Sequence, residues 1–599
     1  MDFRNDSHVP QDSVIEPLAP DTFEKSVLKS SYEAHRKAEL DAQRALDETG
    51  FGKFNYKIIV VSGMMCMNVA FAITSVGFLL PSAACDFDMN TFDKGRLSAS
   101  PIFGMLLGSC IWGCIADTKG RRTALLNCLF LQAIFECFAS VVSNYWGFIV
   151  FKFLSGLALS GQMAVLYTYV GEFQPANQRE KALSLMEIPW VIGTILAPII
   201  AWITIPLEIN LTLARFSFRS WNLYAAMCSV PAFVVGFLLL RLPETPKYLA
   251  ETARYGELRN VLINMYRDNT GNTTEEYIAN LDTAGIKFFT DQINTSLSKS
   301  GEKKKSTLDA LRQFFVTLYE QTALLLKPPY LGRTVITCLG SYCIFSSLYT
   351  LMLWFPELFH RFAEFEDKHP GERASVCIVS QSISLRNYKN ETFVNSSLPI
   401  DQTKTDTVAE NTCDSTIGTQ VYVYTLILAS SCIPVAVIFT VCASRLGFRF
   451  YLVFNSFGCC AVTIGLIFVT TSTQNLILSC IYEALMSVCV TVIFCISVEL
   501  FPTNLRVTGS ALASFCGRIG ALVGNTMFGY LIDDHCFVLI SIVGIELFLA
   551  GVLGFFISGD NNGEAESGDK HKLQVPTNEL PDSGSEKYSS SYANNSTLY

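Results

Sequence analysis

Charge is scarce in this sequence. Asp, Glu, Lys and Arg make up 16% of its 599 residues, compared with about 25% in soluble proteins. The formal net charge is −9, so the basic surface typical of nucleic-acid binding is missing and no nucleic-acid partner is expected. Strict alternation of apolar and polar residues is also missing, which argues against a membrane β-barrel.

Motifs of ATP-driven pumps and metal enzymes are missing as well. No Gly-x4-Gly-Lys-[Ser/Thr] phosphate loop occurs in the chain, which argues against ATP-driven pumping. The histidines all fall in predicted tails or loops and so offer no metal cluster inside a membrane: His8, His35, His360, His369, His535 and His571. We expect no enzyme activity, no cofactor and no metal site.

Apolar residues make up half of the chain and come in blocks of about 20, the length that crosses a bilayer as helix. The sequence therefore predicts an all-α polytopic membrane protein. Its expected spans are 56–80, 99–116, 123–143, 148–169, 183–206, 222–241, 333–356, 421–442, 451–470, 476–498, 510–532 and 537–557.

These twelve spans fall into two groups of six. We expect two homologous bundles enclosing a site at the membrane midplane. The predicted parts are an N-tail (1–55), an N-terminal bundle (56–241), a central loop (242–332) with helical pieces near 256–267 and 307–326, a C-terminal bundle (333–557) with a long loop (357–420), and a disordered C-tail (558–599).

Positive charges in the short loops predict the orientation. If the N-terminus is cytosolic, the inner short loops contain eight basic residues: Lys119, Arg121, Arg122, Arg179, Lys181, Arg445, Arg449 and Arg506. The outer short loops contain four: Lys94, Arg96, Arg215 and Arg219. This imbalance favours both termini in the cytosol, with the loop 357–420 lumenal or extracellular.

Glycosylation sequons and cysteines are compatible with this orientation. The sequons at Asn210, Asn390 and Asn395 fall outside, although those at Asn5, Asn272, Asn294 and Asn595 fall inside. The loop 357–420 contains two cysteines, Cys377 and Cys413. In an oxidising lumen we expect these two to form a disulfide.

A compact charged turn separates the second and third spans. The stretch Gly113-Cys-Ile-Ala-Asp117-Thr-Lys-Gly120-Arg121-Arg122 resembles the G-x-x-x-D-x-x-G-R-[RK] signature of the major facilitator superfamily. "PETPKYL" after span 6 is similar to an element of the sugar and organic-ion branches. Paired E-x(6)-R elements follow spans 4 and 10, as Glu172 to Arg179 and Glu499 to Arg506.

The resemblance implies a fold of twelve helices and a cytosolic gate. Gly120 permits a turn that a Cβ would strain, and Asp117 can lie near the N-terminus of a helix in the other half. We expect Arg121 and Arg122 to bridge to Glu172 or Glu499 across the contact between the two halves. The gate as predicted consists of Gly113, Asp117, Gly120, Arg121, Arg122, Glu172, Arg179, Glu499 and Arg506.

A closer resemblance is to the synaptic vesicle glycoprotein 2 family, and within it to insect-type relatives. It rests on "GFGKFNYKIIVVSGM", "GFLLPSA", Trp354 to Glu357, and the large loop that follows. The chain departs from that family at two places: Asn68 is the only amide where acids usually precede "GFLLP", and Phe494 replaces an acid in span 10. These departures place proton coupling through those positions in doubt.

Ionisable residues inside spans are candidates for function, because a charge is costly in hydrocarbon. The resemblance adds Trp190, Tyr349 and Arg518, and aromatic walls with a cation would suit a small organic solute. Each acid could instead be held in a structural pair, and Glu546 is expected to be structural. The predicted substrate-binding residues are Trp190, Glu187, Tyr349, Arg518, Asn68, Glu136 and Glu483. Glu187 or Glu136 could replace the missing proton acceptors.

These observations favour a secondary transporter or facilitator of a small organic solute, such as an organic ion or a sugar-like molecule. The alternative is a non-transporting membrane scaffold, or a trafficking protein, that contacts vesicle proteins through its outer loop or tails. We expect a monomer in the lipid bilayer of the plasma membrane or of a secretory or synaptic vesicle.

Overall fold

The computed structural model describes residues 41–207, 209–213, 216–252, 254–283, 319, 322–328, 330–369, 373–381, 417–501 and 505–557. Statements about structure refer to these residues. They belong to one compact unit, Met1–Ile557. The predicted C-tail, 558–599, lies outside the described residues.

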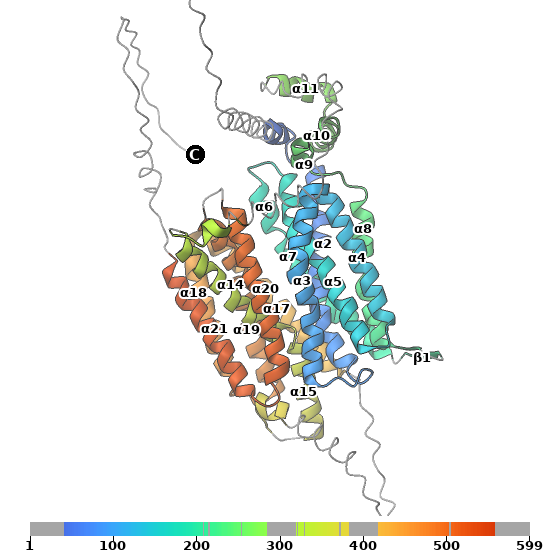
Figure 1. Cartoon of the computed structure of the whole chain (residues 1–599), viewed down its shortest axis with the longest axis vertical. Coiled ribbons are helices and arrows are strands. Elements are labelled where there is room, and N and C mark those ends of the chain that lie inside the picture. The colour runs from blue at the N-terminus through green and yellow to red at the C-terminus, as the bar shows by residue number, and fades with distance from the viewer. Residues whose placement is uncertain are drawn as a thin grey trace, which may run out of the picture. The chain divides into compact units, whose positions relative to one another are not determined.

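The unit consists of helices and one short β-ribbon (Figure 1). The first part of the chain, here called the N-terminal half, contains α2 (Lys53–Ser82), α3 (Thr91–Lys119), α4 (Arg121–Val141), α5 (Tyr145–Glu172), α6 (Arg179–Ser184), α7 (Glu187–Thr204), the 3₁₀ turn η1 (Ile205–Leu207), β1 (Asn210–Leu213), β2 (Phe216–Arg219) and α8 (Ser220–Leu239). Three shorter helices follow it: α9 (Pro246–Glu251), α10 (Tyr255–Thr270) and α11 (Thr274–Thr283).

The C-terminal half contains α14 (Leu331–Met352), α15 (Phe355–Lys368), α17 (Thr419–Leu446), α18 (Phe448–Leu466), α19 (Ser472–Glu499), α20 (Arg506–Leu531) and α21 (Cys536–Phe556). Contact between the halves, here called the seam, is made where α3 packs on α20, α7 on α17 and α15 on α2. Every predicted span falls on one of these long helices.

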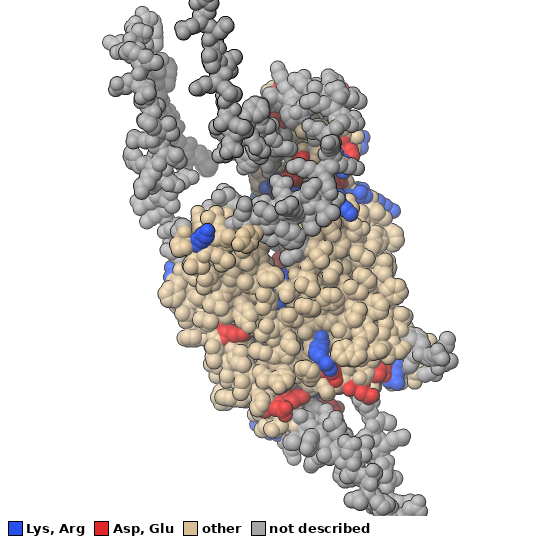
Figure 2. All heavy atoms as spheres, in the orientation of Figure 1, with Lys and Arg blue, Asp and Glu red and all other residues tan. Residues whose placement is uncertain are grey.

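Ten helices are long and apolar enough to cross a membrane, or eleven if the bent pair Thr91–Ser109 and Ile111–Lys119 is one span. The helix α20 occupies the remaining predicted position and falls outside that group. Its sequence is rich in glycine. Figure 2 shows a broad and mostly uncharged surface around the helices, with charged side chains gathered toward its ends. The chain is a multi-pass membrane protein.

Two glycines with positive φ separate consecutive helices at the same end of the unit, here called the motif end. Gly120 (φ +102°) lies between α3 and α4, and Gly447 (φ +76°) lies between α17 and α18. A side chain would strain both positions. The sequence analysis singled out the first of these turns. The opposite end of the helices is here called the α15 end.

The helices α10 and α11 pack on residues 45–55. The Asn269 side chain of α10 accepts a hydrogen bond from the Phe54 amide (3.0 Å) and donates to Asn55 (2.7 Å). Tyr277 of α11 donates to the Ala45 carbonyl (2.7 Å). The helical piece predicted near 256–267 is confirmed as α10, whereas most of the piece near 307–326 lies outside the described residues.

The β-ribbon pairs β1 with β2 in antiparallel register, with Asn210 opposite Arg219. Asn210 is exposed at the first position of β1. The other two predicted glycosylation sites, Asn390 and Asn395, lie outside the described residues.

Candidate functional site

The charged turn at the motif end is held by contacts within the N-terminal half. Arg121 lies 3.4 Å from Glu172 of α5 and 3.5 Å from Glu251 of α9, and its guanidinium lies over the ring of Tyr248. The expected pair with Glu172 therefore forms, but it does not cross the seam. The reason is that the α3–α4 turn packs over the ends of helices in its own half.

Arg122 also binds within this half. Its backbone amide donates to Glu244 (2.9 Å), and its guanidinium donates to the carbonyls of Leu239 and Leu240 at the end of α8 (3.4 and 2.7 Å). A cation at a helix C-terminus stabilises the helix dipole. Among the described residues Arg122 therefore caps α8, and its expected bridge to Glu499 across the seam stays a prediction.

The other predicted gate residues give a mixed result. Asp117 is 59% exposed and pairs with Arg121 at 3.7 Å. Arg179 donates to the Gly171 carbonyl and to Gln43 (3.0 Å each). Gly113 has open space where a Cβ would lie. The side chains of Glu499 and Arg506 are outside the described part of the chain.

Ion pairs do cross the seam at the α15 end. Lys94 of α3 contacts Glu357 of α15 at 2.6 Å, and Glu357 also pairs with Arg361 at 3.2 Å. Arg361 in turn contacts Asp533 (2.7 Å) and the Thr91 hydroxyl (2.9 Å). The Glu357 and Arg361 side chains are only 2% and 4% exposed. Two cations and two carboxylates therefore join the halves in a buried position. The sequence analysis missed this network.

Close backbone packing reinforces the same end of the seam. A Cβ on Gly95 of α3 would lie 3.0 Å from the Cα of Gly529 in α20. One turn deeper, Asn525 donates to Ser98 (2.8 Å) and accepts from the buried Trp354 indole (2.9 Å). The described contacts therefore hold the seam shut at the α15 end.

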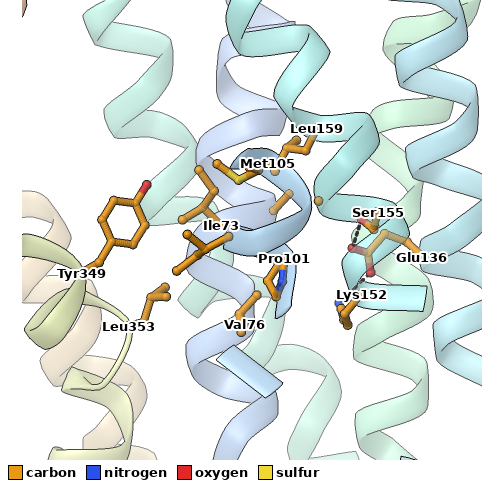
Figure 3. Close-up of a pocket in the computed structure, with 13 residues that line it drawn as sticks. Ile73, Val76, Pro101, Met105, Glu136, Lys152, Ser155, Leu159, Tyr349 and Leu353 are labelled. Atoms are coloured by element: carbon orange, nitrogen blue, oxygen red, sulfur yellow. Dashed lines mark hydrogen bonds and ion pairs between the residues drawn. The ribbon is translucent and has the colours of Figure 1, made fainter. Parts of the chain in front are cut away.

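A cavity of about 20 Å³ lies in the seam. Its lining comes from α2, α3, α4 and α5 of one half and from Tyr349 and Leu353 of the other. Figure 3 shows Tyr349 on one side and Glu136, Lys152 and Ser155 on the other, with apolar side chains between them. This volume holds about one water molecule.

The polar wall of the cavity is a fully satisfied ion pair. Lys152 of α5 contacts Glu136 of α4 at 2.7 Å, and Ser155 donates to the second oxygen of Glu136 (2.6 Å). The two side chains are 2% and 6% exposed. The sequence analysis named Glu136 but missed Lys152, although a lysine inside the apolar run "GFIVFKFLSG" was a readable signal.

The predicted substrate-binding residues do not form one cluster. Tyr349 and Glu136 line the cavity, and Arg518 of α20 reaches its edge by donating to the carbonyl of Met105, a lining residue (3.4 Å). Asn68 lies inside the N-terminal half, where it donates to Gln132 and Gln162 (2.9 Å each).

The remaining three predicted residues lie elsewhere. Trp190 is partly buried against the hydrophobic core. Glu187 lies in the first turn of α7, within electrostatic reach of Cys66 and Tyr167. Glu483 is buried in α19. Glu546, expected to be structural, accepts hydrogen bonds from Ser346 (3.0 Å) and Ser347 (3.2 Å).

The predicted disulfide Cys377–Cys413 is wrong. Cys377 is bonded to Cys536 at the start of α21, with 5.4 Å between their Cα atoms. The residues 373–381 lie against α21, so the nearest cysteine in space is 159 positions away in the sequence. Cys85 is disulfide-bonded too, and Cys413 lies outside the described residues.

Comparisons with solved structures fit this geometry. The crystal structure of a D-xylose–proton symporter matches with a TM-score of 0.55 and 14% identity, covering 84% of this chain and 98% of its own. The proton:xylose symporter of the major facilitator superfamily bound to 6-bromo-6-deoxy-D-glucose matches with a TM-score of 0.52 over 84% and 94%. The chain has the major facilitator fold. At this identity the likeness shows the fold alone.

Sequence comparisons find similarity to two groups. Residues 47–315 match the family described as "Sugar (and other) transporter". Synaptic vesicle glycoprotein 2B of Mus musculus is 28% identical over 326 residues, which is 54% of this chain and 48% of the relative. Synaptic vesicle glycoprotein 2A of Homo sapiens is 31% identical over 248 residues, 40% and 33% of the two chains. The matches thus span about half of those relatives or less.

Proposed function

We propose that this protein carries a small organic solute across a membrane by alternating access. The observation that supports this most is the seam cavity, where Tyr349 of one half faces the Glu136–Lys152 pair of the other (Figure 3). Buried ionisable groups inside a membrane are expensive, and they mark solute or ion pathways. A site shared by two halves changes when the halves rock against each other.

In our proposal, the conformation described is one end state of the alternating-access cycle. The α15 end is closed by the Lys94–Glu357–Arg361 network. In this proposal that end faces the lumen or the outside of the cell and both termini are in the cytosol, which the positive-inside count supports. A cavity of about 20 Å³ admits water but not a sugar. Loading a solute therefore requires the seam to widen.

The lining suits an organic ion or a sugar-like solute. One aromatic ring, Tyr349, can stack on an apolar face, while Arg518 lies at the rim and Lys152 and Glu136 at the far wall. Pockets of this kind bind through apolar contact, and a few polar groups fix the orientation of the ligand. The matched family is described for transporters of sugars and other solutes, which supports the same range.

Uptake into proteoliposomes tests the proposal. A panel of sugars, organic cations, carboxylates and amino acids is offered to the purified protein, to Tyr349→Ala and to Arg518→Ala. We expect one class to enter, and we expect each variant to reduce its uptake at least tenfold. Tyr530→Ala is the matched control, because Tyr530 is 68% exposed and does not line the cavity. Equal uptake in all four proteins would mean that the solute does not pass through the cavity.

The alternative function is a scaffold or trafficking protein of a vesicle or plasma membrane. The similarity to synaptic vesicle glycoproteins 2A and 2B favours it. Its vesicle-protein partners would bind the loop 357–420 or the tails, and the protein would work as a monomer. A folded protein that takes up no member of the panel would favour this function over transport.

A further inference from the structure

One face of α19 is polar where the helix is buried. Ser472, Asn475, Ser479 and Glu483 follow each other at spacings of three and four residues, so they lie on one side of the helix. Their exposed fractions are 5%, 2%, 0% and 9%. The face begins at the α15 end and stops at Glu483, about two turns beyond Asn475.

Each of the four side chains has a buried polar atom without a hydrogen-bond partner among the described residues. These atoms are Ser472 Oγ, Asn475 Nδ2, Ser479 Oγ and Glu483 Oε2. A buried polar group without a partner is costly, so such groups are usually satisfied by ordered water. Four of them in a row along one helix indicate a path that water can occupy.

A cavity of about 30 Å³ lies beside the start of this face. Asn475 lines it, together with apolar residues of α18, α20 and α21. Its volume holds about one to two water molecules. A water in the cavity can accept a hydrogen bond from Asn475 Nδ2. Asn475 therefore links the cavity to the polar face of α19.

Glu483 ends the path in surroundings that disfavour its charge. The titratable groups within electrostatic reach are Cys432 of α17, Cys459 of α18, Cys480 and Tyr482 of α19, and Tyr349 of α14. Arg518 of α20 acts on Tyr349, and no basic side chain pairs with Glu483 in the described part of the chain. Burial without a cation favours the neutral carboxyl group.

We propose that Glu483 is a proton-binding site reached from the α15 end along the polar face of α19, and that its protonation couples solute movement to a proton gradient. In the conformation described, the proton remains on the carboxyl oxygen. When the halves rock and Glu483 meets water on the other side, the O–H bond breaks and the proton leaves to that water. This inference rests on the proposed transport function and assigns its coupling ion.

Glu483 differs from the other carboxylates inside the helices in its partners. Glu136 pairs with Lys152 at 2.7 Å, and its other oxygen accepts a hydrogen bond from Ser155, so both of its oxygens have partners. Glu546 is hydrogen-bonded to Ser346 and Ser347. Tyr349 lines the seam cavity and is also within electrostatic reach of Glu483 and Arg518. It therefore connects the proton site to the solute site.

Infrared spectroscopy of the purified full chain tests the protonation without any solute. We expect a carbonyl stretch of a protonated carboxyl group that disappears in Glu483→Gln. Glu136→Gln together with Lys152→Met is the matched control, because it removes the other carboxylate along with its cation, and it should leave that band unchanged. In D2O, Ser479→Ala together with Asn475→Leu should slow the deuterium shift of the band at least tenfold. A wild-type spectrum that Glu483→Gln leaves unaltered would overturn the proposal.

A transport measurement then tests coupling. For the solute found by the panel, Glu483→Gln should abolish the acceleration by a pH gradient but keep solute exchange at equal pH. If Glu483→Gln keeps both the acceleration by a pH gradient and the solute exchange, the coupling role is overturned, even if the infrared band is present. If no solute of the panel enters, the transport function fails, while the infrared result still decides whether Glu483 binds a proton.

Discussion

Three carboxylates inside the helices have three different surroundings. Glu136 faces Lys152, Glu546 accepts from two serines, and Glu483 has no charged partner among the described residues. Because both sites are removed from water, the Glu136–Lys152 pair is costly to break and Glu483 is costly to ionise. The chemical role of each acid therefore follows from its neighbours and not from its depth in the membrane.

We expect Lys152→Met to destabilise the protein strongly, because it leaves the Glu136 carboxylate buried without its cation. The typical cost of breaking a buried pair is about 3–5 kcal/mol. The double variant Lys152→Met with Glu136→Gln should regain most of the loss. Thermal unfolding in detergent measures the effect, and a double variant no more stable than the single one would contradict it.

Single residues also show where sequence reasoning stops. The pattern of apolar blocks identifies Glu136, Glu483 and Arg518 as buried charges, since each interrupts a block. It does not reveal that Glu136 binds Lys152, because partners on different helices have no fixed spacing in the chain. A pairing of this kind depends on how α4 packs on α5.

At the scale of elements, α20 shows how glycines let two helices approach closely. A Cβ on Gly520 would lie 2.3 Å from the Tyr342 carbonyl oxygen of α14, and one on Gly524 would lie 2.3 Å from the Ser346 carbonyl oxygen. Small residues allow helix backbones to approach closely inside membranes. These glycines of α20 therefore lie where it packs on α14.

We expect Gly520→Ala to lower stability by about 1–3 kcal/mol, the usual cost of overpacking. The neighbour is a backbone oxygen, which cannot rotate away. Gly113→Ala is the matched control, since nothing lies within 4 Å of its added Cβ. Thermal unfolding of both variants checks the prediction, which fails if they melt together.

The disulfide gives a second prediction at this scale. Non-reduced peptide mapping should link Cys377 to Cys536, and Cys413→Ser should retain that linked peptide. Cys536→Ser should remove it and cost about 2–4 kcal/mol of stability. A Cys377–Cys413 peptide in the wild-type digest would contradict the structure and restore the pairing expected from the loop.

At the scale of the whole membrane unit, the sequence predicts the order of the helices and the position of the Gly120 turn. It does not predict which contacts join the halves. The motif turn was expected to bridge the seam, yet its described contacts stay in one half. The Lys94–Glu357 pair, separated by 263 residues, joins the halves instead. Contacts this distant in sequence have no local pattern.

The closed α15 end makes alternating access directly testable. Ser98 and Asn525 touch across the seam at 2.8 Å, so Ser98→Cys with Asn525→Cys should form a disulfide that locks this end shut. Because a carrier must open both ends in turn, the oxidised double variant should lose at least nine-tenths of its uptake, and reduction should restore it. Each single variant, oxidised in the same way, controls for the chain's own cysteines. Full uptake through a protein shown to be cross-linked would mean that the solute does not pass this end of the seam.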